Sequence, residues 1–153
     1  MAGKEQHGGT LVPCLWCSTP ITSAKWPKPP PLAANLDRKA AQKNAEVFLS
    51  IITVQEAVGG WLALINGTRA GRDQIAGYTS FQRTIAAFHH FDVLPFDIEA
   101  ATIFHRLKSV HPRTGTMDLK IAAICLAHDA MLLTRNLSDF RHIPGLRVEN
   151  WLD

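Results

Sequence analysis

The stretch Val47-Phe-Leu-Ser-Ile-Ile-Thr-Val-Gln-Glu56 changes its hydrophobic pattern midway, and this change indicates the fold class. Its first part, 47–52, is a short and mostly apolar run, which is typical of a strand buried in a parallel sheet. From Thr53 to Leu64, apolar residues recur at intervals of three and four, which predicts a helix with one face against that sheet. The segment therefore predicts a strand that leads directly into a helix.

The same alternation of strands and helices continues to the end of the chain. The further elements expected are helices over 73–90, from 97 onward and over 117–128, and strands over 93–96, 131–134 and 146–151. Because Pro95 cannot donate a hydrogen bond, the strand that contains it belongs at a sheet edge. Strands that alternate with helices require crossover connections, which give a mainly parallel sheet covered on both faces. We therefore expect an α/β fold, a three-layer α/β/α sandwich.

The composition of the chain limits the classes of protein to consider. Its 153 residues are 46% hydrophobic and 19% charged, which suits one folded domain and excludes a fully disordered chain. No apolar run approaches the roughly 18 residues of a membrane span. The formal net charge of +3 is compatible with nucleic-acid binding. Three cysteines cannot all pair, so we expect a reducing, cytoplasmic environment.

The front of the chain differs from the rest. Residues 1–31 hold six of the nine prolines and a single acidic residue, Glu5. We interpret this segment as a disordered, proline-rich tail, and residues 33–153 as the folded domain. The run Leu11-Val-Pro-Cys-Leu-Trp16 is a poor candidate for a central strand, because Pro13 has no backbone donor for the ladder.

Acidic and amide side chains follow several of the expected strands. Glu56 comes just after the first strand, Asp118 opens a later helix, and Asn136 and Asp139 follow the strand over 131–134. In a parallel sheet, functional side chains gather in the crevice outside the carboxyl ends of the strands. Carboxylates that converge there can hold Mg²⁺ or Mn²⁺, which prefer oxygen ligands and can activate water beside a phosphate.

Each of these side chains also has a purely structural interpretation. Thr53-Val-Gln-Glu56 fits a helix capping box, in which Glu56 reaches back to the Thr53 amide. Asp118 can stabilise its helix by interacting with the helix dipole. Asn136 or Asp139 can cap the short segment that follows the strand. Spacing alone leaves both interpretations open.

Two other kinds of site are disfavoured by the sequence. Cys14-Leu-Trp-Cys17 has the CxxC spacing of a zinc site, but no second CxxC or H-x₃₋₅-H pair follows it. The chain also contains no G-x-G-x-x-G or G-x-x-x-x-G-K loop, which argues against an unrelated nucleotide-binding domain.

Five segments together resemble the PIN domain, in particular the VapC-type toxins of bacterial toxin–antitoxin pairs. They occur in the family's order and at its spacing, and the resemblance extends from about Val47 to Trp151, about two-thirds of the chain. They are Ser50-Ile-Ile-Thr-Val-Gln-Glu56, Leu94-Pro-Phe-Asp97, Gly115-Thr-Met-Asp-Leu-Lys-Ile-Ala-Ala123, Leu133-Thr-Arg-Asn136 with Asp139-Phe140, and Pro144-Gly-Leu-Arg-Val-Glu-Asn-Trp151. The resemblance implies a Mg²⁺- or Mn²⁺-dependent endoribonuclease with an RNA substrate, a homodimeric assembly and a cognate antitoxin.

The resemblance also implies roles for individual residues. Glu56 and Asp118 correspond to metal-binding acids of the family. Asn136 occupies a position where many relatives have aspartate, and Asp139 lies close enough in sequence to supply that carboxylate instead. The cations expected to contact RNA phosphates, which set position without reading sequence, are Arg113, Lys120 and Arg135.

The chain departs from the family at its front. PIN domains open with a strand that ends in Leu-Asp-Thr, and that aspartate is a metal ligand. The corresponding stretch here, near Trp16-Cys17-Ser18-Thr19, contains no acid. We therefore expect a domain without its usual first strand and with impaired catalysis. The alternative is a catalytically inactive PIN-like protein that only binds an antitoxin or RNA.

Overall fold

The computed structural model describes residues 13–15 and 31–151 of the chain. Within these residues, five short strands form one sheet in the order β3-β2-β1-β4-β5, and all neighbouring strands run parallel. The strands are β1 (Pro13–Leu15), β2 (Phe48–Ser50), β3 (Asp92–Leu94), β4 (Met131–Leu133) and β5 (Val148–Glu149). The expected edge position of β3 is confirmed.

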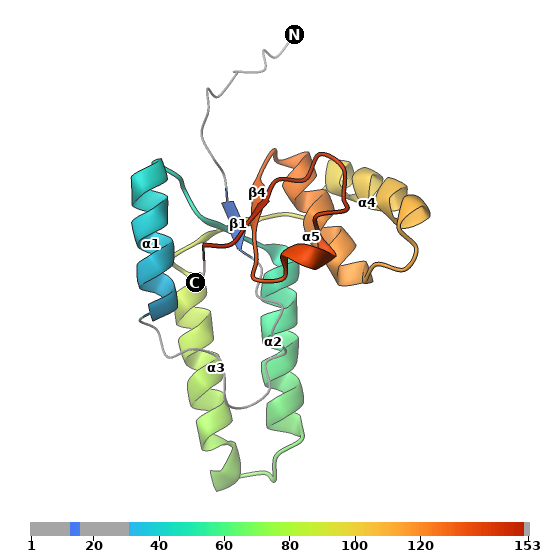
Figure 1. Cartoon of the computed structure of the whole chain (residues 1–153). Coiled ribbons are helices and arrows are strands. Elements are labelled where there is room, and N and C mark those ends of the chain that lie inside the picture. Colours follow the sequence, from blue (N-terminus) through green and yellow to red (C-terminus); the bar gives the residue numbers. More distant parts are fainter. Residues whose placement is uncertain (1–12, 16–30, 152–153) are drawn as a thin grey trace.

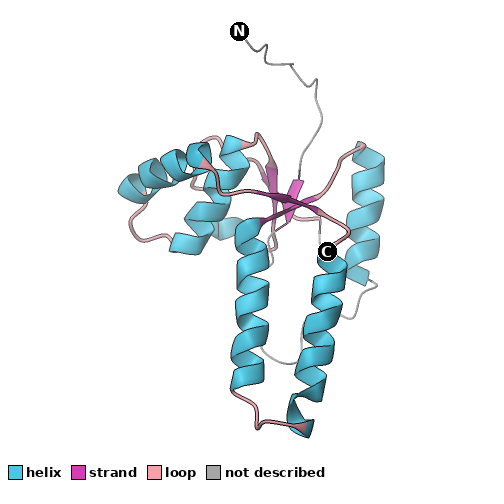
Figure 2. Ribbon diagram, turned by 180° about the vertical axis from the view of Figure 1, so that it is seen from behind, coloured by secondary structure: helices cyan, strands magenta, loops and turns pink. Residues whose placement is uncertain are grey.

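Helices cover the sheet and extend beyond it. They are α1 (Pro31–Lys43), α2 (Ile51–Asn66), α3 (Ile75–Phe88), α4 (Ile98–Val110) and α5 (Thr116–Ala127), with short 3₁₀ turns at Arg72–Gln74 and Leu137–Asp139. Helix α1 lies on one side of the sheet, and α4 and α5 lie on the other (Figure 1). Helices α2 and α3 run side by side and project away from the sheet as an arm (Figure 2). No helix in the described part of the chain is long and apolar enough to cross a membrane.

Successive residues of β4 point into separate cores on the two faces of the sheet. Leu132 packs in a cluster built largely from α5, including Leu119 and Ile124. Met131 and Leu133 pack in the second cluster with Leu36 of α1 and Trp151; the members of both clusters are buried. Because a strand buried on both faces needs a layer on each side, these cores confirm the predicted three-layer α/β/α sandwich.

The position of β1 corrects one expectation. Pro13–Leu15 lies at the centre of the sheet, where Leu15 pairs in register with Leu49 and Leu133. The sequence argument against a central strand is therefore wrong for these three residues. Pro13 is the first residue of the strand, a position where the missing backbone donor is tolerated.

The rest of the predicted tail, residues 1–12 and 16–30, lies outside the described part of the chain, so its predicted disorder stays a prediction. Helix α1 begins at Pro31, the last residue of the predicted tail. Proline suits the first position of a helix, since its missing N–H has no helical partner there in any case.

Candidate active site

Glu56 is held by a helix that starts earlier than the sequence pattern suggested. Ser50 ends β2 and caps α2: its backbone is extended, and its Oγ accepts a hydrogen bond of 3.0 Å from the Thr53 amide. The predicted capping box, with Thr53 as the cap, is therefore wrong, because the helix already begins at Ile51. This leaves Glu56 well inside α2, without a capping role.

The Glu56 carboxyl group lies half-buried near a second acid. Its Oε2 atom is buried and has no hydrogen-bond partner among residues 13–15 and 31–151. Burial raises the pKa of Glu56, and the negative charge of Asp118 raises it further. The effect of that charge places the two carboxylates near each other, although they lie more than sixty residues apart in sequence. The structure thus brings Glu56 and Asp118 together at one site.

Asp118 is fixed by the first turn of α5. Gly115 is the N-cap of this helix, and its carbonyl accepts a hydrogen bond of 3.0 Å from the Leu119 amide. The Asp118 side chain folds back toward this cap, since a Cβ built on Gly115 would lie 2.7 Å from Asp118 Oδ2. The next turns of α5 are anchored by fully buried side chains such as Ile121 and Ile124. The start of α5 is therefore held firmly against the core.

Asn136 and Asp139 interact with each other. The Asn136 side-chain amide donates to Asp139 Oδ2, and Ser138 Oγ donates to Asn136 Oδ1 at 2.9 Å. Asp139 is exposed at the end of the 3₁₀ turn that follows β4. No three His, Cys, Asp or Glu side chains among residues 13–15 and 31–151 form a group that could hold one metal ion, so Asp139 does not join Glu56 and Asp118 in such a group.

The three predicted phosphate-binding cations differ in their surroundings. Arg113 and Arg135 are exposed. Lys120 is half-buried, and its Nζ lies 5.7 Å from the centre of the Phe96 ring and 6.0 Å from that of Phe104. Sequence reasoning missed these two rings, because neither is near Lys120 in sequence. Cation–π contacts of this kind hold Lys120 in a defined place.

The sequence matches a known family over most of its length. The model of the PIN domain matches residues 27–146. The chain belongs to the PIN domain family. This confirms the resemblance drawn from the five sequence segments.

Individual relatives of this PIN domain are ribonucleases and complexes of the VapC type. Ribonuclease VapC1 of Rickettsia felis is 42% identical over 62 residues, which are 38% of this chain and 46% of that protein. The chain thus spans about half the length of the curated relatives it matches. A crystal structure of VapBC2 from Rickettsia felis, bound to a promoter DNA fragment, has a TM-score of 0.61 and 21% identity, and covers 80% of this chain and 86% of that chain. It shows the shared fold.

A further solved structure is similar in sequence as well as in fold. VapBC-5 of Mycobacterium tuberculosis is described as a member of the VapBC family of toxin–antitoxin systems. It is 27% identical with a TM-score of 0.50, and covers 68% of this chain and 79% of that chain.

The paired acids of this PIN domain suit a hydrated divalent cation. Mg²⁺ is usually held in proteins by one or two carboxylates and keeps several waters. Glu56 Oε2 is an unpartnered buried acceptor, and the nearby Asp118 supplies a second carboxylate. A cation bound between them would lower the repulsion that raises the pKa of Glu56.

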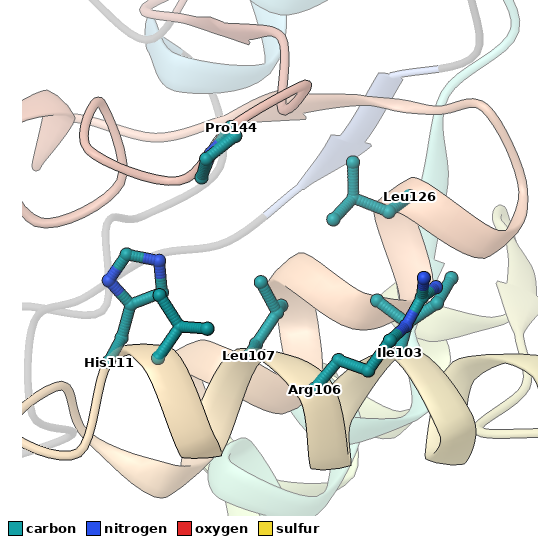
Figure 3. A pocket seen from close by; sticks show the side chains of 7 residues that line it. Ile103, Arg106, Leu107, His111, Leu126 and Pro144 are labelled. Atoms are coloured by element: carbon teal, nitrogen blue, oxygen red, sulfur yellow. The ribbon is translucent and has the colours of Figure 1, made fainter.

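A separate groove lies on the α4–α5 side of the PIN domain. It has a volume of about 420 Å³ and runs between α4, the end of α5 and the loop at Pro144 (Figure 3). Its walls are mostly apolar, with Arg106 and His111 as polar members. Glu56 and Asp118 do not line it, so this groove is distinct from the paired acids.

Proposed function

We propose that this chain is a VapC-type endoribonuclease that hydrolyses RNA phosphodiesters and depends on Mg²⁺ or Mn²⁺. The observation that carries the proposal is the buried, unpartnered Oε2 of Glu56 beside the carboxylate of Asp118. Two acids held close together in this way can share one metal ion. The match to ribonuclease VapC1 supports the choice of RNA as substrate.

The roles of the residues follow from their chemistry. Glu56 and Asp118 bind the cation directly or through water, and their rigid helices hold it in a defined place. When bound, the cation supplies the positive charge that activates a water molecule and offsets charge on the phosphate. Asp139, with Asn136 as its partner, forms the outer part of the site.

The cations near the site orient the RNA. Arg113 and Arg135 are exposed and can reach backbone phosphates, while Lys120 is restrained by its aromatic neighbours and presents its charge from a defined place. Such contacts give affinity that falls with salt and little sequence preference. The formal net charge of +3 favours the same kind of partner.

The second candidate function is binding without catalysis. It is favoured by a specific observation: the segment Trp16–Thr19 contains no acid where the resembled family has its first aspartate. In this case the domain still binds RNA or an antitoxin, but its metal lacks one anchoring carboxylate. We propose impaired catalysis as the better description, because water can replace one ligand of Mg²⁺.

We further propose that the chain assembles as a homodimer and binds a cognate antitoxin. The similarity to VapBC-5, a member of the VapBC family of toxin–antitoxin systems, supports an antitoxin partner. Several large apolar side chains of the arm are exposed, namely Leu62, Ile75, Tyr78 and Ile85. Exposed apolar patches of this kind favour protein partners. Sedimentation velocity at micromolar concentration tests the dimer, and a purely monomeric protein would contradict it.

The catalytic proposal is tested by replacing each acid with its amide. We expect purified wild-type chain to cleave RNA slowly with Mg²⁺ or Mn²⁺, and not at all with EDTA. Glu56→Gln and Asp118→Asn should each lower this cleavage by at least about a hundredfold, since misplacing the reacting groups has effects of that size. Asp37→Asn is the matched control, because Asp37 is an exposed acid on α1.

The outcomes separate the two candidate functions. Equal loss of cleavage in the Asp37→Asn control would assign the loss to the removal of negative charge in general and not to the proposed site. RNA binding without any metal-dependent cleavage by the wild-type chain would favour the binding protein. Full cleavage by Asp118→Asn would rule out the proposed site.

A further inference from the structure

At the start of α5, the Asp118 carboxylate lies close to the N-cap residue, Gly115. Gly115, the N-cap, has no side chain, and the Asp118 carboxylate occupies the space where one would be. A Cβ built on Gly115 would lie 2.7 Å from Asp118 Oδ2 and 3.5 Å from Asp118 Cγ. Real carbon and oxygen atoms do not approach as closely as the shorter of these distances.

The backbone does not explain why glycine is needed here. Gly115 has φ −55° and ψ 139°, a conformation that any L-amino acid adopts readily. By contrast, Gly71 and Gly145 have positive φ angles, where glycine is favoured for its backbone. At position 115 the relevant property is therefore the absence of a side chain.

We propose that Gly115 is a positioning residue for Asp118: its missing side chain lets the Asp118 carboxylate lie back over the start of α5 and stay beside Glu56. Its effect on catalysis rests on the function proposed above. The effect of Gly115 on the Asp118 side chain does not rest on that function, because the two residues are in contact at the start of the same helix.

The closeness of the Asp118 carboxylate to position 115 predicts which group moves when this residue gains a Cβ. The carboxylate is the far end of a flexible side chain, whereas the surrounding helix is held by a hydrogen bond from the Leu119 amide to the Gly115 carbonyl and by buried apolar residues. Turning the Asp118 side chain is therefore easier than moving the helix. The domain should fold normally with a displaced carboxylate.

The experiment uses two substitutions at this position and one matched control. Gly115→Ala adds the Cβ but gives a poor N-cap, whereas Gly115→Ser adds the same Cβ and gives a good N-cap. Gly59→Ala is the control, since a Cβ at Gly59 meets no atom within 4 Å. The readouts are the Asp118 side-chain orientation in crystal structures, Mn²⁺ affinity by electron paramagnetic resonance, and RNA cleavage by the full chain.

We expect both substitutions at position 115 to turn the Asp118 side chain and to weaken Mn²⁺ binding about tenfold or more. Cleavage should fall about a hundredfold, while the melting temperature of Gly115→Ser stays close to that of the wild type. In an Asp118→Asn background, Gly115→Ala should have no further effect on Mn²⁺ binding. Gly59→Ala should leave Mn²⁺ binding and cleavage unchanged.

Three results would overturn the inference. The first is an unmoved Asp118 side chain in both variants. The second is recovery of Mn²⁺ binding by serine, which would assign the effect to helix capping. The third is an equal loss in Gly59→Ala. If the wild type neither binds Mn²⁺ nor cleaves RNA, the proposed function fails, and the crystal structures still decide whether Gly115 sets the position of Asp118.

Discussion

Two neighbouring carboxylates, that of Glu56 inside α2 and that of Asp118 in the first turn of α5, form the chemically distinctive feature of this domain. The buried Glu56 Oε2, without a hydrogen-bond partner in the described part of the chain, lowers stability, and a second carboxylate beside it lowers stability further. Structural ion pairs relieve such repulsion with a cationic side chain. At Glu56 the shift in pKa has burial and Asp118 as its causes, with no compensating cation among them. Two carboxylates placed in this way suit a site that binds a metal ion.

This arrangement makes stability depend on pH in a defined direction. The pKa of Glu56 in the folded protein lies above its ordinary value of 4.5. The folded state therefore holds this proton more tightly than the unfolded chain, and its contribution to stability is lost as pH rises through the folded pKa. Glu56→Gln cannot ionise. We expect this variant to melt at a higher temperature than the wild type at pH 7, with the difference shrinking as the pH falls and absent below about pH 4.5.

Thermal unfolding between pH 4 and pH 8, with and without Mg²⁺, measures this effect. Glu46→Gln is the matched control, because Glu46 is an exposed acid. Mg²⁺ should raise the melting temperature of the wild type more than that of Glu56→Gln, since ligands stabilise the state that binds them. A Glu56→Gln variant that is less stable than the wild type at pH 7 would contradict the assigned environment.

At the scale of elements, the arm of α2 and α3 stands apart from the sandwich. The two helices are joined within the described structure by a buried hydrogen bond of 2.9 Å from Trp61 Nε1 to Thr84 Oγ1. Thr84 in turn donates to the Ser80 carbonyl at 3.0 Å. A polar link of this kind fixes how the helices pair, because a buried indole N–H needs an acceptor. The exposed apolar residues of the arm are thus presented on a rigid support.

The arm makes the antitoxin proposal testable. We expect Tyr78→Ser to weaken binding of the proposed antitoxin by about thirtyfold, because buried aromatic side chains dominate protein interfaces. Isothermal titration calorimetry with the co-expressed partner measures the affinity. Gln82→Ser is the control, as an exposed polar residue one turn further along α3. Equal affinities for wild type and Tyr78→Ser would show that the antitoxin binds a surface other than this part of the arm.

Most elements could be predicted from the sequence because their periodicity is strong. The helices after β2 and β3 follow from apolar spacing, and β3 lies at the sheet edge as expected, although Pro95, the basis of that prediction, lies just beyond the strand. Helix α2 began earlier than predicted, because capping depends on the backbone at Ser50, which a pattern of residue types does not reveal. Strand β1 was missed because proline tolerance depends on position within a strand, and three residues are too few for a periodic signal.

The candidate site was predictable only in part for a similar reason. Glu56 could be expected at the carboxyl edge of the sheet because it follows β2, whereas Asp118 opens α5, which follows helix α4 and not a strand. The pairing of Asn136 with Asp139 and the rings around Lys120 depend on side-chain directions that sequence spacing does not give. The role proposed for Gly115 depends on a contact between non-adjacent residues, and glycine itself gives no sign of it.

At the scale of the whole molecule, the central position of β1 brings its end to the functional edge of the sheet. Leu15 pairs with Leu49 of β2 and Leu133 of β4, and the carboxyl ends of parallel strands meet at one edge. The elements that follow β2 and β4 carry Glu56 and Asp139. The chain has Trp16 directly after Leu15, where the resembled family has an aspartate. One substitution can therefore return an acid to the sequence position that the family uses.

This geometry allows a direct test of impaired catalysis. The variant Trp16→Asp with Cys17→Thr rebuilds the sequence Leu-Asp-Thr after β1. We expect it to bind Mn²⁺ more tightly and to cleave RNA at least about a hundredfold faster than the unmodified chain, because a third carboxylate fixes the cation against the scissile phosphate. Trp16→Asn with Cys17→Thr is the control, since it has the same size without the charge. Adding Asp118→Asn to the rebuilt variant should abolish the gain. Full activity in the unmodified chain would show that another residue already supplies this ligand, and unchanged activity in the rebuilt variant would show that the first aspartate is not what limits catalysis.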